Sequence, residues 1–175
     1  MTELTTTRLR LRPFRPGDAD AVHAYASDPE VVRHMDWGPN TPAETEAFVA
    51  GAVHPADGVH PFAVEHGGRL IGAVELRVTS RIHARAEFGY TLARSAWGQG
   101  FATEAAVAVL AFAFDRIGLH RVAATCDPAN TGSRRVLEKA GLLYEGHLKD
   151  YLHIRGEWRD RLLYATTRPA CSATG

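Results

Sequence analysis

The sequence predicts an α/β (α+β) fold, in which helices flank a mixed, mostly antiparallel, twisted sheet of about seven strands. The length of 175 residues suits a single domain over 1–175, with a core of about 7–166. Apolar residues make up 45% of the chain and charged residues 23%, as in folded globular proteins. The strand patterns come first as hairpins and then as one strand–helix–strand unit, which favours a mixed sheet over a fully parallel one.

The chain is expected to begin with a strand and two helices. Residues 8–14 alternate charged side chains with leucine, which is the period of a half-buried strand. Asp18 follows a Pro-Gly break and can cap a helix that ends near Ser27. Asp28 then begins a short helix that is expected to continue through Met35.

A capping box predicts the third helix. Thr41 and Glu44 have the spacing of that motif, and Pro42 occupies the first helical position, which proline favours. The helix is expected to end near Val53. The next segment, 54–61, contains two prolines and a glycine and is interpreted as a loop.

The centre of the chain carries the strongest strand signals. Residues 62–66 and 70–79 are rich in Val, Ile and Leu and flank a Gly-Gly pair, which is typical of a hairpin. Another strand is expected over 85–92. After a glycine-rich turn, an alanine-rich helix is predicted over 101–117, and Gly118 ends it.

The remaining pattern completes the sheet. A strand is predicted over 120–125 and a helix over 131–140, where a glycine follows. The closing strands are expected at 142–148 and 159–166. Residues 169–175 are interpreted as a flexible tail.

Composition excludes several classes of protein. Lys plus Arg and Asp plus Glu are both 20, and this zero net charge argues against a general nucleic-acid binder. Cys126 and Cys171 lie far apart, which favours a reducing compartment, and no apolar run has the length of a signal peptide or of a membrane helix. The nine histidines form no pair with metal-ligand spacing. We therefore expect a cytoplasmic, metal-free protein without membrane contact.

A glycine-rich loop is the most informative motif. Trp97-Gly98-Gln99-Gly100-Phe101-Ala102 lies between a predicted strand and a predicted helix, so free backbone N–H groups at the helix N-terminus can receive a phosphate. The alternative is a tight turn without a ligand. A Walker loop requires a lysine that is missing here, and a Rossmann fingerprint requires a small residue where Thr103 stands.

On these residues the chain resembles the GCN5-related N-acetyltransferase (GNAT) superfamily, and within it the bacterial ribosomal-protein-alanine (protein N-terminal) acetyltransferase branch. The loop matches the family pattern Arg/Gln-x-x-Gly-x-Gly/Ala at both small positions, with tryptophan at the first. The resemblance covers about 7–166, and the other segments that carry it are Thr7–Arg12, Ser27–Val31, Asp127–Ser133, Val136–Gly141 and Asp160–Tyr164.

The resemblance implies how acetyl-CoA binds. Two central parallel strands would diverge in a V-shaped opening, where strand backbone groups would pair with the pantetheine arm and the glycine loop would hold the pyrophosphate. For Asn130 and Ser133, a helix cap is the alternative role. The implied acetyl-CoA-binding residues are Tyr90, Thr91, Leu92, Trp97, Gly98, Gln99, Gly100, Phe101, Ala102, Thr103, Asn130 and Ser133.

Acetylation of an amine needs a base, an oxyanion donor and a proton for the thiolate. Glu87 is the candidate base, directly or through water, although it could also face solvent or pair with an arginine. Ser133 is the family-like proton donor, with Tyr144 and Tyr151 as alternatives, and the oxyanion would meet a backbone N–H near Leu92. An acyl-cysteine route through Cys126 is disfavoured, because no histidine is recognisably paired with it.

The resemblance therefore implies an enzyme that moves an acetyl group from acetyl-CoA to a primary amine, by direct attack in a ternary complex. The expected acceptor is a protein N-terminal α-amine. A small-molecule amine such as an aminoglycoside or polyamine is the alternative, because the segments 28–42 and 147–158 that would border the acceptor carry both charge signs. An acyl-CoA-binding regulatory module without activity is the alternative from another class. Whether the chain forms a homodimer stays open.

Overall fold

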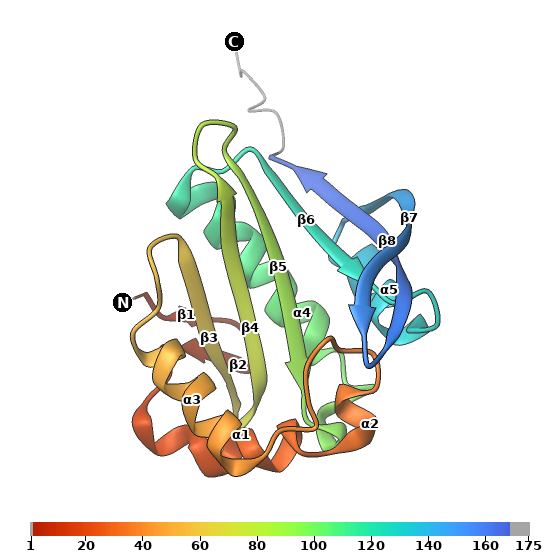
Figure 1. Cartoon of the computed structure of the whole chain (residues 1–175). Coiled ribbons are helices and arrows are strands. Elements are labelled where there is room, and N and C mark those ends of the chain that lie inside the picture. The colour runs from red at the N-terminus through yellow and green to blue at the C-terminus, as the bar shows by residue number, and fades with distance from the viewer. Residues whose placement is uncertain (1, 169–175) are drawn as a thin grey trace.

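A single eight-stranded sheet organises the protein, whose computed structural model describes residues 2–168 (Figure 1). The strand order is β1-β2-β3-β4-β5-β6-β8-β7, and β5–β6 is the parallel pair among the described strands. The predicted mixed, mostly antiparallel sheet is confirmed, with one strand more than expected. The strands are β1 (Leu4–Thr5), β2 (Leu9–Arg12), β3 (Val59–His66), β4 (Arg69–Ser80), β5 (Arg85–Leu92), β6 (Arg121–Cys126), β7 (Leu143–Ile154) and β8 (Glu157–Thr167).

Helices cover both faces of the sheet. Buried side chains of α4 pack with the larger core cluster on one face, and those of α1 and α3 form a second cluster on the other. The expected tail, 169–175, lies outside the described residues. The helical segments are η1 (Pro16–Asp18), α1 (Ala19–Ala26), α2 (Pro29–Val32), α3 (Pro42–Val53), η2 (Arg94–Ala96), α4 (Phe101–Ala111), η3 (Phe112–Ile117) and α5 (Thr131–Lys139).

The capping box at α3 is present as predicted. The Glu44 backbone N–H donates to Thr41 Oγ1 at 3.3 Å, and the Thr41 backbone N–H donates to Glu44 Oε2 at 2.7 Å. Each side chain thus satisfies a helix-terminal N–H that has no partner within the helix. The helix begins and ends at the expected residues, Pro42 and Val53.

Some element boundaries differ from the sequence prediction. Strand β3 begins at Val59 and contains Pro61, which the sequence placed in a loop. Strand β2 pairs with β3 only from Ala63 onward, so Pro61 lies where β3 is an edge strand and proline is tolerated. Strand β7 extends to Ile154, beyond the predicted end at residue 148. Its pairing with β8 is irregular between Leu148 and Leu152, where Asp150 has φ +47°, so the side-chain alternation that indicates a strand is interrupted there.

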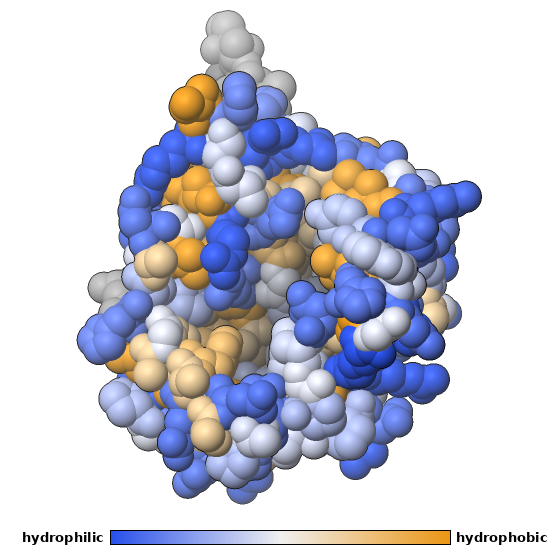
Figure 2. All heavy atoms as spheres, in the orientation of Figure 1, coloured by the Kyte–Doolittle hydropathy of each residue, from blue (hydrophilic) through white to orange (hydrophobic). Residues whose placement is uncertain are grey.

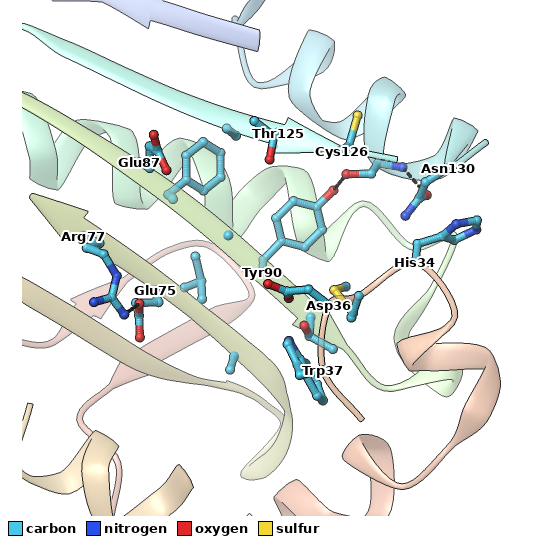
Figure 3. Close-up of a pocket in the computed structure, with 18 of the residues that line it drawn as sticks. His34, Asp36, Trp37, Glu75, Arg77, Glu87, Tyr90, Thr125, Cys126 and Asn130 are labelled. Carbon is cyan, nitrogen blue, oxygen red and sulfur yellow. Dashed lines mark hydrogen bonds and ion pairs between the residues drawn. The ribbon is translucent and has the colours of Figure 1, made fainter. Parts of the chain in front are cut away.

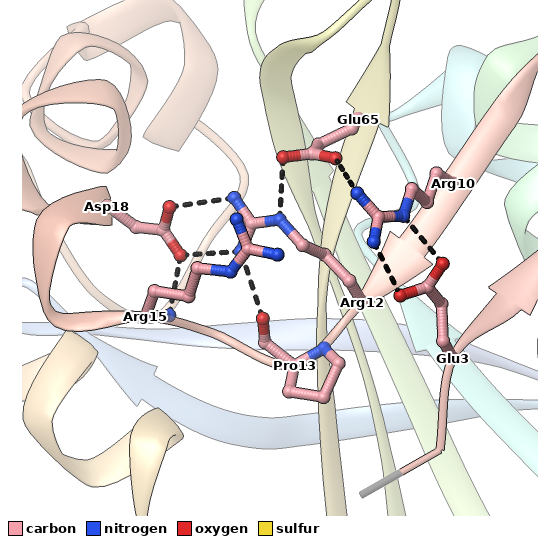
Figure 4. Close-up of polar contacts among 7 residues, drawn as sticks. All are labelled: Glu3, Arg10, Arg12, Pro13, Arg15, Asp18 and Glu65. Carbon is pink, nitrogen blue, oxygen red and sulfur yellow. Dashed lines mark hydrogen bonds and ion pairs between the residues drawn. The ribbon is translucent and has the colours of Figure 1, made fainter.

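A buried ion pair fixes the corner between β2 and α1 (Figure 4). The Arg12 guanidinium, only 4% exposed, donates to both carboxylate oxygens of Asp18 at 2.8 Å and to Glu65 Oε1 at 2.6 Å. Asp18 also accepts from the Arg15 backbone N–H at 2.7 Å. The expectation that the Asp18 side chain caps α1 is wrong, because its oxygens are engaged by these two residues.

The same contacts fix the ionisation of Asp18. Burial raises the pKa of this carboxyl, but hydrogen bonds from Arg12 and from the Arg15 backbone outweigh that effect, and the net pKa is lowered. A carboxyl with a lowered folded-state pKa contributes stability above its unfolded pKa, and the contribution is lost as the pH falls through the folded-state pKa.

Replacing Asp18 with Asn should therefore destabilise the protein by about 3 kcal/mol at pH 7, because the buried Arg12 loses a charged partner. The free energy of unfolding, measured by urea denaturation, should show this loss, and the difference from the unsubstituted protein should shrink below about pH 4. Glu3→Gln, which removes the closer of the two carboxylate partners of exposed Arg10, is the control and should change stability much less. Equal effects of the two substitutions would contradict a stabilising role for the buried pair.

Candidate active site

A cavity opens where β5 and β6 separate. The two strands pair at only three positions, Arg85 with Arg121, Ala86 with Val122 and Glu87 with Ala123. Beyond them lies a cavity of about 670 Å³ that both strands line, together with residues of the loop between α2 and α3. Figure 2 shows the surface hollowed here. The V-shaped opening between two parallel strands is therefore confirmed.

A close backbone contact holds the end of β5 against β4. Gly72 of β4 lies opposite Leu92, and a Cβ at Gly72 would be 2.2 Å from the Thr91 carbonyl oxygen and 2.8 Å from Leu92 Cα. Only glycine allows this approach. Gly72 lies inside an apolar strand pattern that predicts a hairpin without it, although an isolated glycine inside a strand is a signal of close backbone approach.

The free edge of β5 presents backbone hydrogen-bonding groups to the opening. The Ala93 N–H donates to the Ile71 carbonyl at 2.8 Å, so Leu92 and Gly72 form a facing pair without mutual hydrogen bonds. The N–H and C=O groups of Leu92, and by alternation those of Tyr90, therefore point away from β4. The Trp97 indole donates to the Leu92 carbonyl at 2.8 Å. The Leu92 N–H and both Tyr90 groups can receive an extended ligand.

On the sheet face that packs against α1 and α3, Glu87 lies opposite Arg77 of β4 (Figure 3). Arg77 does not pair with it, since its guanidinium instead contacts Glu75 Oε1 at 2.7 Å. Among residues 2–168, no Lys, Arg or His nitrogen lies within 4.0 Å of the Glu87 carboxylate. An arginine partner for Glu87 is thus not observed. Glu87 is exposed to solvent, as the other alternative expected, and it also lines the cavity.

On the opposite face, three side chains form a connected group at the start of α5 (Figure 3). The Tyr90 hydroxyl donates to Ser133 Oγ at 3.0 Å, and the Ser133 backbone N–H donates to Asn130 Oδ1 at 2.9 Å. Asn130 is therefore the N-cap of α5, which was the alternative role predicted for it. Burial raises the pKa of Tyr90 to about 12, so its hydroxyl keeps its proton at neutral pH. The family resemblance had implied a role only for the backbone of Tyr90.

The other nucleophile and acid candidates are less suited to the chemistry. Burial raises the pKa of the Cys126 thiol to about 11, so at neutral pH it lacks the thiolate that an acyl-cysteine route needs. Tyr144 and Tyr151 of β7 are 55% and 47% exposed and do not line the cavity. Ser133, in contrast, lines the cavity.

The glycine loop lies directly before α4. Gly98 and Gly100 have φ values of +74° and +80°, a region that only glycine adopts readily, and Gly100 is the N-cap of α4. Arg8 at the start of the chain holds this loop, because its Nη1 donates to the Gln99 carbonyl at 2.9 Å and its Nε to Glu104 Oε2 at 2.7 Å. Sequence alternation had indicated only a strand residue at Arg8.

The structure divides the predicted catalytic and acetyl-CoA-binding residues into three sets: residues that line the cavity, Leu92, and residues of the glycine loop and the first turn of α4. Glu87, Tyr90, Thr91, Asn130 and Ser133 line the cavity. Leu92 is buried at the end of β5. The others belong to the glycine loop and the first turn of α4, outside the cavity lining, and they are Trp97, Gly98, Gln99, Gly100, Phe101, Ala102 and Thr103.

Two arginines attach the loop between α2 and α3 to the β7–β8 hairpin. Arg155 Nη2 donates to the carbonyl oxygens of Trp37 and Gly38 at 3.1 and 2.8 Å. Arg161 Nη1 donates to the His34 carbonyl at 3.1 Å. The attached loop lines the cavity with Asp36 and Trp37 (Figure 3).

Residues 2–168 contain neither a membrane-spanning helix nor a metal-binding cluster. No helix there has the length and apolar character needed to cross a membrane. No cluster of three or more His, Cys, Asp or Glu side chains is arranged to hold a metal ion in the same part of the chain.

Comparison with known proteins identifies the family. The acetyltransferase (GNAT) domain family matches residues 8–143. The uncharacterized N-acetyltransferase YnaD of Bacillus subtilis is 33% identical over 162 residues, which are 93% of this chain and 95% of YnaD. This chain therefore belongs to the GNAT acetyltransferase family, and it is an N-acetyltransferase.

Two further matches concern the branch within the family. The structure of Mycobacterium smegmatis RimJ in complex with CoA-disulfide has a TM-score of 0.80 and 33% identity, with 95% of this chain and 87% of that chain covered. The ribosomal protein uS5-alanine N-acetyltransferase of Escherichia coli is 37% identical over 81 residues, which are 46% of this chain and 42% of that enzyme. The predicted resemblance to the ribosomal-protein acetyltransferase branch is thus confirmed.

Proposed function

We propose that the protein transfers the acetyl group of acetyl-CoA to a primary amine by direct attack within a ternary complex. The observation that carries the proposal is the free edge of β5, where the Tyr90 and Leu92 backbone groups face the opening. An extended pantetheine arm has amides that can pair with such an edge as an added strand does. The bound CoA-disulfide of the mycobacterial RimJ structure supports the same cofactor class here.

The glycine loop is the proposed pyrophosphate site. Its positive φ values turn the chain so that the first N–H groups of α4 are free, and these groups and the helix dipole favour an anion. Arg8 holds the loop by two hydrogen bonds, which reduces the entropy lost on binding.

The proposed chemistry is a balanced acyl transfer. The neutral amine nitrogen attacks the thioester carbonyl carbon, the Leu92 N–H stabilises the oxyanion, and the C–S bond breaks as the amide forms. Glu87 takes the proton of the amine, directly or through a water molecule. Ser133 gives a proton to the departing thiolate, and the hydrogen bond from the Tyr90 hydroxyl stabilises the charge that develops on Ser133 Oγ.

The proposed acceptor is an α-amine at a protein N-terminus, as named for the partial relative from Escherichia coli. A small cationic amine is a second candidate, because Asp36, Glu75 and Glu87 all line the cavity. Thiol release with acetyl-CoA, measured over N-terminal ribosomal-protein peptides beside small amines, separates these acceptors. Binding of acetyl-CoA without release for any amine would indicate an acyl-CoA-binding module instead.

Gly100→Asp should weaken acetyl-CoA binding at least tenfold, roughly 1.4 kcal/mol or more, because it adds a side chain and a negative charge at the proposed pyrophosphate site. Titration calorimetry should give one acetyl-CoA per chain before the substitution and no binding of NAD. Gly118→Asp is the matched control, since Gly118 also has φ +80° but lies at the far end of the α4–η3 helix. Equal affinities in the two variants would remove the loop from the site.

Glu87→Gln should lower turnover by roughly 10²-fold and leave acetyl-CoA affinity nearly unchanged, because the amide cannot accept the amine proton. The rate should be measured below the pKa of the acceptor amine. Glu46→Gln on the exposed surface of α3 is the control for loss of one charge. Turnover of Glu87→Gln within twofold of the unsubstituted protein would exclude Glu87 as the base.

Ser133→Ala should lower kcat about 10- to 100-fold while acetyl-CoA affinity changes only a few-fold, because the lost interaction develops in the transition state. Tyr90→Phe should reduce kcat less, since it removes only the hydrogen bond to Ser133. Melting temperature and kcat are measured on the same preparation. A normal rate with a lowered melting temperature would show that Ser133 only stabilises the start of α5.

A further inference from the structure

Arg161 of β8 is a buried cation that the chemistry above does not use. Its side chain is 6% exposed and lines the cavity. Nη1 donates to the His34 carbonyl, whereas Nε is buried without a hydrogen-bond partner. Within residues 2–168, no carboxylate oxygen lies within 4.0 Å of the guanidinium. A buried guanidinium without an anion is costly, so a group that enters the cavity can supply the missing acceptor.

The register of the sheet puts Arg161 on the acceptor side of the opening. Leu162 pairs with Cys126, whose side chain packs in the α4 core, so the neighbouring Arg161 points to the opposite face. Glu87 belongs to that same face. Counting along the paired strands, Arg161 is level with Thr91 across the gap.

Asp127, the acidic residue beside Arg161 in the sheet register, already has other partners. By register, Asp127 follows β6 next to Arg161, yet its carboxylate accepts from the Ala129 backbone N–H at 2.8 Å and lies 3.6 Å from His34 Nδ1. The guanidinium is also on the sheet face opposite α4, whereas the proposed pyrophosphate site is at the start of α4. A ligand group that meets Arg161 is therefore not the pyrophosphate.

We propose that Arg161 binds the oxygen of the carbonyl or carboxylate group attached to the carbon that bears the acceptor amine. This inference rests on the proposed function and narrows its substrate class to α-amino acyl compounds, such as peptide N-termini and free amino acids. The guanidinium donates N–H groups to this oxygen, and Glu87 of the same cavity takes the amine proton directly or through a water molecule. Alkylamines and polyamines have no such oxygen and leave the Arg161 donors unsatisfied.

The test compares matched acceptors that differ at this group. L-Alaninamide and isopropylamine share the amine-bearing carbon and one methyl group, and only the first carries a carbonyl. Arg161→Gln should lower kcat/KM for alaninamide about 10- to 100-fold and for isopropylamine less than twofold, with the KM for acetyl-CoA unchanged. Each acceptor is compared with itself across variants, so the different amine pKa values cancel.

Two further arms identify the oxygen and guard against misfolding. Rates with L-alanine and with an alanyl peptide show whether Arg161 binds a free carboxylate or a peptide carbonyl. If Arg161→Gln loses the preference for L-alanine or for the alanyl peptide over isopropylamine, the proposal is supported. Arg161→Lys keeps the charge in the buried position but has no planar fork. It should lose part of the alaninamide preference while its melting temperature stays close to that of the unsubstituted protein.

Arg155→Gln is the matched control, because Arg155 also donates to the α2–α3 loop but does not line the cavity. It should change the rates for both acceptors alike. Equal losses for alaninamide and isopropylamine in Arg161→Gln would overturn the proposal and reduce Arg161 to a loop attachment. Absence of thiol release with every amine would instead overturn the proposed function, and this inference with it.

Discussion

The close contact between Gly72 and the end of β5 is the constraint on which the site depends. It keeps Leu92 against β4 while β6 turns away, so one edge of β5 is left without a strand partner. Unpaired backbone groups inside a protein are costly unless something binds them. The same separation that creates the cavity therefore also supplies its most directional hydrogen-bonding groups.

The sheet divides the site into two chemical environments. The face toward α4 and α5 carries the neutral pair Tyr90 and Ser133, held by hydrogen bonds and protonated at neutral pH. The other face carries the charged side chains, among them Glu87 and Arg161. In the proposed reaction, the thioester and the amine approach from opposite faces and meet in the gap, so proton acceptor and proton donor stay apart and do not neutralise each other.

Local patterns in the sequence were sufficient for much of the fold and part of the site. The capping box of Thr41 and the glycine loop are decided by neighbouring residues, so periodicity and spacing locate them. Long-range contacts were not accessible in this way. Arg12 pairs with Asp18, six residues away, and with Glu65, 53 residues away, whereas Arg8 pairs with Glu104, 96 residues away. Nothing in the alternation of residues 8–14 distinguishes the two arginines. Likewise, glycine is required at position 72 because Leu92, twenty residues later, lies too close for a Cβ.

The attachment of the α2–α3 loop has a consequence for amino-acid substitutions within that loop. Arg155 and Arg161 bind main-chain carbonyl oxygens, which every amino acid possesses. These hydrogen bonds therefore depend on the backbone conformation of the loop and do not involve its side chains. Positions such as Asp36 and Trp37 can be exchanged without loosening the wall that they form. Under the proposed function, substitutions in this short segment would change the contacts of the acceptor and leave the strands of the transfer site in place.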